Sequence, residues 1–187
     1  MAMKAKINKV HIHLIQGDLL TLPVQSVVVV TDTNLTVDES LAAAAGPIVQ
    51  QQTALISWCA VGQAVMTDSG NLKNIRKIIH AVAPRWGEGS ERGKLGNVVW
   101  ECLHLAEDNE LESIALPAIS VGSLGYPVEN CAKIMLTRVI DFTFEKLKHV
   151  SSIIFCVKDA SELAVFQSEF ERQIHALKQT GEGHVRV

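Results

Sequence analysis

The chain has 187 residues, a length typical of one domain. Hydrophobic residues make up 48% of it and charged residues 20%, which excludes a disordered chain. The 17 Lys and Arg stand against 20 Asp and Glu, a net charge of −3, so the basic excess that a nucleic-acid-binding protein needs is missing.

The sequence also predicts the cellular compartment and the number of domains. No apolar run approaches the roughly 20 residues of a membrane helix, and the start lacks the apolar stretch of a signal peptide. The four cysteines are scattered without a Cys-x-x-Cys pair, which favours free thiols in a reducing compartment. We therefore expect one monomeric intracellular domain over 1–187, nuclear or cytoplasmic, without a membrane partner. The short flanks and the start Met1-Ala2-Met3 are compatible with excision from a larger protein.

The first half of the chain alternates strand-like and helix-like patterns. Strands are predicted over 10–15, 25–31, 62–67 and 77–82. The second of these contains four consecutive valines, as expected for a strand buried on both faces. The Ala- and Gln-rich stretch 38–57 predicts a helix, which a Gly-Pro pair either interrupts or divides into two helices.

The second half continues the alternation. Apolar residues that recur every three or four positions predict a helix over 92–109. A strand over 113–119 follows, and after a glycine-containing loop a long helix starts with Pro127 and runs to about Lys148.

The carboxyl-terminal part holds the last strand, over 152–157, and the last helix. Asp159 and Glu162 resemble a helix-start pair, and the tail over 179–187 is predicted to be frayed. One apolar face of this helix is formed by Leu163, Phe166, Phe170, Ile174 and Leu177. Strands alternating with such helices imply a mainly parallel sheet covered on both faces, whose ligands bind at the carboxyl ends of the strands.

The loop over 119–126, Ile-Ser-Val-Gly-Ser-Leu-Gly-Tyr, is the strongest local signal for a ligand site. Gly122 and Gly125 permit positive φ and a close approach of the backbone to a ligand. Successive amides ahead of a helix suit a phosphate or diphosphate, and Tyr126 would close the loop with an aromatic face. The alternative is an ordinary turn, because the glycine spacing matches neither a P-loop nor the Rossmann fingerprint.

Other polar residues give weaker signals. Asp18, after the first strand, could accept a hydrogen bond from an amine such as the adenine N6, or it could simply cap a turn. His11 and His13 share one face of a strand without an evident third ligand, so no metal site is predicted. His80 is expected to be a hydrogen-bonded core residue. Without a Gly-x-Ser-x-Gly elbow or a marked thiolate, no catalytic residue is predicted.

Taken together, these segments resemble the macrodomain family over roughly 10–174. The resemblance is carried, in order, by residues 17–19, 23–30, 45–47, 59–64, 78–86, 105–107 and 113–127. It is closest to the macrodomains attached to poly(ADP-ribose)-polymerase-type transferases, and macro-histone macrodomains are similar at a greater distance. The resemblance implies an α/β fold, a three-layer α/β/α sandwich around a mixed, mostly parallel sheet of six or seven strands, with a core at about 10–177.

The family's usual ligand is ADP-ribose, free or attached to protein, and no cofactor or metal is implied. By resemblance, Asp18 would take the adenine N6 and the Leu19 amide an adenine ring nitrogen. The distal ribose would lie beside the aromatic residue of the glycine-containing loop. The diphosphate would be held by amides of that loop, which are those of Ser120, Val121, Gly122, Ser123, Leu124, Gly125 and Tyr126.

The chain departs from the family pattern at the end of the valine strand and beside adenine. Hydrolytic members carry Asn-x-x-Asn after this strand, but here Thr31 replaces the first Asn, which helps position the distal ribose, and Asn34 matches the second loosely. The following stretch, 35–40, lacks the family's Gly-Gly pair and is several residues short, which removes positioning of the hydrolytic water. Lys158 lies where many relatives place an aromatic residue beside adenine, so its stem or charge would cover the base.

Three functions follow from this pattern. We expect a non-catalytic domain that binds ADP-ribose or mono- or poly-ADP-ribosylated proteins. One alternative is a hydrolase that removes mono-ADP-ribose from proteins, which Asn34 and the complete diphosphate loop favour. The other is a degenerate macrodomain that serves as a protein-interaction scaffold or binds another nucleotide.

Overall fold

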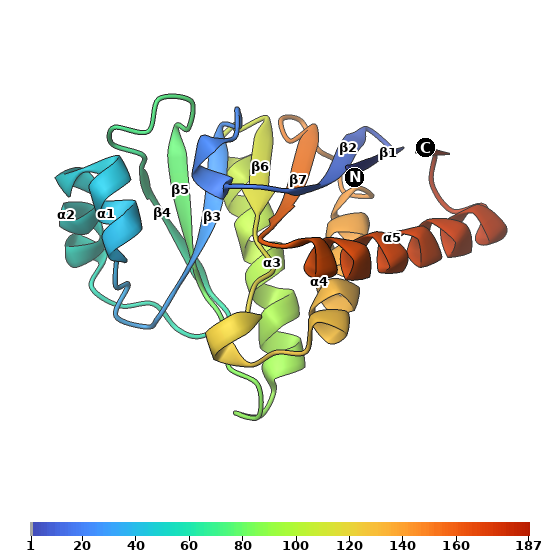
Figure 1. Ribbon diagram of the computed structural model, residues 1–187. Coiled ribbons are helices and arrows are strands. Elements are labelled where there is room, and N and C mark those ends of the chain that lie inside the picture. The colour runs from blue at the N-terminus through green and yellow to red at the C-terminus, as the bar shows by residue number, and fades with distance from the viewer. Residues whose placement is uncertain (1) are drawn as a thin grey trace.

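The computed structural model describes residues 2–187, which form one mixed eight-stranded sheet with helices on both faces (Figure 1). The strands are β1 (Met3–Ile7), β2 (Val10–Gln16), β3 (Ser26–Thr31), β4 (Ala64–Asp68), β5 (Lys77–Val82), β6 (Ser113–Leu116), β7 (Ser152–Val157) and β8 (Val185–Arg186). The helices are α1 (Glu39–Ala45), α2 (Pro47–Ile56), α3 (Glu91–Asp108), α4 (Val128–Phe142) and α5 (Ala160–Thr180), with the short 3-10 turns η1 (Leu19–Thr21) and η2 (Gly122–Leu124).

The strand order is β4-β5-β3-β6-β7-β2-β1-β8. The five strands from β5 to β2 in this order are all parallel, and antiparallel strands extend the sheet at both sides. Because the parallel strands all end at the same edge, the loops that follow β2, β3, β5, β6 and β7 meet there. This carboxyl edge is where a sheet of this type binds its ligands.

Two apolar layers cover the sheet. Val27 and Val28 are adjacent on β3, point to opposite faces and are both fully buried, which confirms the prediction of a strand buried on both sides. Val28 packs in the large core with residues of α3, α4 and α5. Val27 packs in a smaller core with residues of α1, and hydrophobic residues of η1 pack against that core. The α/β/α sandwich implied by the resemblance is therefore confirmed.

Gly46 divides the predicted helix over 38–57 into two helices. Its φ is 82°, a value that favours glycine, and Pro47 follows as the first residue of α2, where its missing N–H costs no helical hydrogen bond. Upstream, the Asp38 carboxylate caps α1 by accepting the Leu41 amide at 2.8 Å. Of the two alternatives for this stretch, division into two helices is correct.

The sheet has eight strands rather than six or seven because both ends of the chain join it. Lys6 and Ile7 of β1 pair with Arg186 and Val185, so part of the tail that was predicted to be frayed forms β8. The periodicity signal failed here because β8 has only two residues and β1 carries lysines in its short alternation. Along residues 2–187, none of the helices combines the length and apolarity needed to cross a bilayer.

The helix predicted to run to Lys148 ends at Phe142. Beyond this end, the chain is held by a residue far away in the sequence. The Glu107 carboxylate accepts the backbone amides of Lys148, His149 and Val150, the last at 2.7 Å, and thereby fixes the chain in a turn before β7. Partial burial acts to raise the pKa of Glu107, but these hydrogen bonds together outweigh it and hold that pKa below its ordinary value.

Candidate functional site

The sheet opens between β3 and β6 at its carboxyl edge. The ladder between these strands contains only two pairs, Ser26 with Ile114 and Val27 with Ala115. Beyond them β3 continues to Thr31 without a partner on that side, and Val30 is 37% exposed although it lies in a central strand. The ladder between β3 and β6 is therefore open beyond Val27, and this unpaired stretch of β3 leaves Val30 exposed at the carboxyl edge. We call this unpaired stretch the β3–β6 opening.

The loop after β6 is closed by its own backbone. The Tyr126 amide donates to the Ser120 carbonyl at 2.9 Å, and η2 lies between the two residues. Ser120 has φ of 69° and is buried, and Gly122 and Gly125 have φ of 80° and 76°. The positive φ values allow the chain to turn sharply enough to expose Gly122 and Ser123 at the edge of the sheet. The structure thus places the predicted diphosphate-binding residues together in one tight loop, and their contact with a ligand stays a prediction.

A second segment, residues 84–86 after β5, holds this loop in place. The Ser120 hydroxyl donates to the Pro84 carbonyl at 2.7 Å. The Arg85 Nη1 donates to the Ser123 carbonyl at 3.1 Å, and the Trp86 amide donates to the Leu124 carbonyl at 2.9 Å. This segment was not predicted from the sequence as part of the site, because an Arg and a Trp that follow a strand look the same in a sequence as ordinary exposed residues. Their position after a parallel strand was the available signal.

Trp86, rather than Tyr126, provides the exposed aromatic surface of the loop. The Tyr126 ring is 3% exposed and packs edge-on against Trp86, with 5.0 Å between ring centroids. Burial raises the pKa of the Tyr126 hydroxyl. The Trp86 side chain stays 45% exposed. The Tyr126 ring is therefore buried and its amide is engaged by the Ser120 carbonyl, so any aromatic contact at this loop would come from Trp86.

The loop after β2 brings three predicted residues together. The Asp18 Oδ1 accepts the Leu20 amide at 3.1 Å and caps η1, so the turn-capping role considered for this residue is present. The Gly17 amide donates to the Val157 carbonyl at 3.1 Å, which ties the end of β2 to the end of β7. Asp18 and Lys158 are both exposed at the ends of these neighbouring strands. Their predicted contacts with adenine, and that of the Leu19 amide, stay predictions.

The loop after β3 is closed by hydrogen bonds within itself. The Thr31 hydroxyl donates to the Thr36 carbonyl at 2.8 Å. The Asp32 Oδ1 accepts the amides of Asn34 and Thr36 at 3.0 and 3.1 Å, and Thr36 is the main reason why the pKa of Asp32 lies below its ordinary value. Leu35 has φ of 58° and is buried at the bottom of the turn. Thr31 and Asn34 thus lie at the predicted edge, with the Thr31 hydroxyl occupied and Asn34 exposed.

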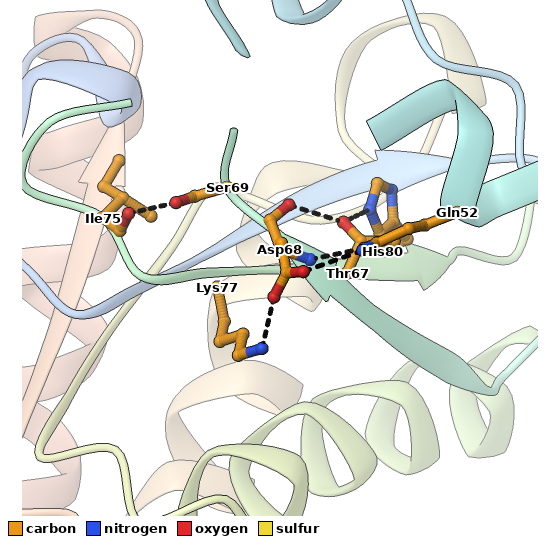
Figure 2. A network of polar contacts seen from close by, with 7 residues as sticks. All are labelled: Gln52, Thr67, Asp68, Ser69, Ile75, Lys77 and His80. Atoms are coloured by element: carbon orange, nitrogen blue, oxygen red, sulfur yellow. Dashed lines mark hydrogen bonds and ion pairs between the residues drawn. The ribbon is translucent and has the colours of Figure 1, made fainter. Parts of the chain in front are cut away.

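A polar cluster away from this edge contains His80. Figure 2 shows that His80 meets Thr67 across the β4–β5 pair, with 2.8 Å between the ring Nε2 and the hydroxyl oxygen. Asp68, next to Thr67, contacts Lys77 and Gln52. Burial lowers the pKa of His80 to about 4, so the ring is neutral at physiological pH. His80 is a hydrogen-bonded core residue, as predicted, and this cluster stabilises the antiparallel side of the sheet.

The His, Cys, Asp and Glu side chains are the candidates for metal binding, and the four cysteines are the candidates for nucleophilic chemistry. Within residues 2–187, His, Cys, Asp and Glu side chains form no group of three or more that could hold a metal ion. The four cysteines are free and buried, and burial raises the pKa of all four thiols. A thiol with a raised pKa is a poor nucleophile at neutral pH.

Comparisons with known proteins identify the family. The model of the Macro domain family matches residues 24–135, more than half of the chain. A macro domain-containing protein of Caldanaerobacter subterraneus subsp. tengcongensis is 34% identical over 162 residues, which cover 81% of this chain and 92% of that protein. The O-acetyl-ADP-ribose deacetylase of Salmonella newport is 38% identical over 141 residues, covering 70% and 78%.

The fold leads to the same family. The solved structure of the Oceanobacillus iheyensis macrodomain with ADP superposes with a TM-score of 0.87 at 25% identity, covering 94% of this chain and 98% of that one. These relatives are bacterial, and they do not show the closer resemblance to the macrodomains of polymerase-type transferases that the sequence suggests. The chain belongs to the macrodomain family.

Proposed function

We propose that this macrodomain binds ADP-ribose, free or attached to protein, without hydrolysing it. The observation that carries the proposal is the spacing of two loops along the carboxyl edge. Asp18 follows β2 and the Ser120–Tyr126 loop follows β6, and β7 alone lies between these strands. Two interstrand spacings amount to about 10 Å, a span similar to the one that the adenosine part of ADP-ribose places between its exocyclic amine and the diphosphate.

The chemistry of the two loops suits the two ends of such a ligand. At one end the exposed Asp18 carboxylate offers a charged acceptor for the adenine amine. At the other, the backbone amides of a glycine-containing loop suit a diphosphate without any need for positive net charge. The names of two relatives, an O-acetyl-ADP-ribose deacetylase and a macrodomain solved with ADP, support the same ligand class.

The loop after β3 supports binding without catalysis. Its Thr31 hydroxyl donates to the backbone of the same loop and its Asp32 Oδ1 accepts from it, so this donor and this oxygen are not available to orient a water molecule or the distal ribose. Hydrolysis needs a water molecule held in a near-attack geometry, and losing that positioning costs several kcal/mol of barrier. The deacetylase among the relatives, together with the exposed Asn34, keeps hydrolysis as the second candidate.

Titration calorimetry tests the binding proposal. We expect heat on titration with ADP-ribose, weaker binding of AMP, and weak binding of NAD because its nicotinamide extends the distal ribose. A folded protein that gives no heat with millimolar ADP-ribose would contradict the proposal. An assay with O-acetyl-ADP-ribose and with a mono-ADP-ribosylated protein tests catalysis. Release of product above the blank would mean that the domain is a hydrolase and not a non-catalytic binding domain.

The setting of this function is also a proposal. We propose that the domain acts as a monomer inside the cell, in the nucleus or cytoplasm, and reads mono- or poly-ADP-ribosylated proteins as the resemblance to polymerase-attached macrodomains implies. The four buried free cysteines fit a reducing compartment.

A further inference from the structure

We infer that Arg85 is a positioning residue, which orients the Ser120–Tyr126 loop for the anionic part of the ligand. The inference rests on the proposed function and concerns a residue outside the set that the sequence pointed to. Arg85 lies in the 84–86 segment after β5, on the far side of β3 from the loop that it contacts. The loop therefore passes the carboxyl end of β3 and is fixed on both sides of the β3–β6 opening.

The contacts of this segment all engage one side of the loop. The Ser123 and Leu124 carbonyls accept from the Arg85 side chain and the Trp86 amide, and the Ser120 hydroxyl donates to Pro84. In a trans peptide the C=O and N–H groups point in opposite directions. Holding the Ser123 carbonyl toward Arg85 therefore turns the Leu124 N–H, which shares that peptide, away from the 84–86 segment. In this way Arg85 sets the direction in which the loop presents an amide.

The loop needs such external support because its glycines allow many backbone conformations. Gly122 and Gly125 both have positive φ, and a side chain placed at Gly122 would meet no atom within 4 Å. Glycines lower the cost of turning the chain but leave many conformations accessible when no contact selects one. A binding loop held in its bound conformation before the ligand arrives avoids part of that ordering cost.

Arg85 is suited to this role because it contributes little to the core. Its side chain is 56% exposed, and apart from Ser123 it contacts Glu88 at 3.8 Å between Nε and Oε1. Removing the guanidinium therefore changes the loop rather than the fold. Arg172 provides a matched control, since its side chain is 58% exposed and is paired with Glu169 on α5, far along the chain from the loop.

The test compares Arg85→Met, Arg85→Lys and Arg172→Met by calorimetry. Met keeps the length of the stem without a donor, and Lys keeps a donor that can reach the Ser123 carbonyl. We expect Arg85→Met to weaken ADP-ribose binding about fivefold, because only part of the free energy of this exposed, charge-assisted hydrogen bond passes through the loop to the ligand. Adenosine, which lacks the phosphates, should bind Arg85→Met and wild type equally. Arg85→Lys and Arg172→Met should bind ADP-ribose like wild type.

Two further measurements separate positioning from direct contact with the ligand. In the ligand-free protein, Arg85→Met should shift the amide NMR signals of Gly122 and Gly125, whereas Arg172→Met should leave them unchanged. The salt dependence of ADP-ribose binding should be the same in Arg85→Met and wild type, because a guanidinium in contact with the diphosphate would change that slope.

The inference is overturned if Arg85→Met binds ADP-ribose like wild type, or if it loses as much affinity for adenosine as for ADP-ribose. It is also overturned if the affinity of Arg85→Met for ADP-ribose depends less on salt concentration than that of wild type. A wild-type protein that binds no ADP-ribose would refute the proposed function instead. In that event the NMR signals of Gly122 and Gly125 would still report whether Arg85 orders the loop: unchanged signals would overturn the inference, and shifted signals would support it.

Discussion

Asp18 has two roles in the proposed site, and two substitutions separate them. Its Oδ1 accepts the Leu20 amide and caps η1, which leaves the second oxygen for the adenine amine. Asp18→Asn keeps a carbonyl oxygen for the cap, and asparagine is as good a cap as aspartate. It removes the charge, however, and directs an NH2 group toward another donor. Asp18→Ala removes the cap and the ligand contact together.

The expected magnitude follows from this geometry. One hydrogen bond to a charged group contributes about 1.5–3 kcal/mol, so Asp18→Asn should weaken ADP-ribose binding by about 10- to 150-fold. Its free energy of unfolding should stay close to that of wild type. Asp18→Ala should lose similar affinity and, in addition, about 0.5 kcal/mol of stability, at the low end for a cap because η1 has no fully buried residue and is three residues long.

Calorimetry with ADP-ribose and its inosine analogue gives the decisive comparison. The analogue carries a carbonyl oxygen in place of the amine, so it should bind wild type poorly because the Asp18 carboxylate repels it. Asp18→Asn should discriminate much less between the two ligands, since its amide can donate to that oxygen. The coupling energy of this cycle isolates the contact from other effects of the substitution. Equal preference for ADP-ribose in wild type and Asp18→Asn would refute the assignment of Asp18 to the adenine amine.

Two further predictions concern stability. Burial lowers the pKa of His80 from 6.5 to about 4, so below pH 6.5 the unfolded chain takes up a proton that the folded chain does not. His80 alone should therefore lower the free energy of unfolding by about 3 kcal/mol between pH 7 and pH 4. In urea unfolding, the stability of His80→Gln should depend less on pH than that of wild type or of the exposed control His175→Gln. At Gly70 an added Cβ would lie 2.0 Å from the Ala45 carbonyl oxygen, whereas at Gly122 it would meet nothing within 4 Å. Gly70→Ala should therefore cost several kcal/mol by thermal unfolding and Gly122→Ala about 1 kcal/mol, and equal losses would contradict this reasoning.

The order of strands and helices was predictable because their signals are local. The uninterrupted valines of β3 indicate a buried strand, and the apolar residues of α5 recur at the spacing of one helix face, as they pack. β8 has two residues and owes its existence to the edge that β1 provides, a contact between the two ends of the chain. The turn between α4 and β7 is held by Glu107, about forty residues earlier, whose carboxylate accepts three backbone amides there. Neither contact leaves a periodic signal.

In the candidate site too, some features could be predicted from the sequence and others could not. That Asp18 and the Ser120–Tyr126 loop lie at one edge follows from their positions after parallel strands. Which aromatic ring is exposed there does not, because the burial of Tyr126 depends on Trp86, a residue of another loop. A tyrosine after a glycine is equally compatible with an exposed ring and a buried one, so its ring orientation required the three-dimensional contact.

Binding and catalysis place different demands on the three loops of this edge. In the proposed site, binding needs the loops after β2 and β6, which would hold the adenine and the diphosphate of ADP-ribose over a span of about 10 Å. Catalysis also needs the loop after β3 to place a water molecule within a few tenths of an ångström of its productive position. In this chain that loop satisfies its own groups, through Thr31 to Thr36 and through Asp32 to the amides of Asn34 and Thr36. Opening it would break three hydrogen bonds of about 1 kcal/mol each before any water is held. A macrodomain can therefore lose hydrolysis through changes in this loop alone while the loops after β2 and β6 retain the ligand.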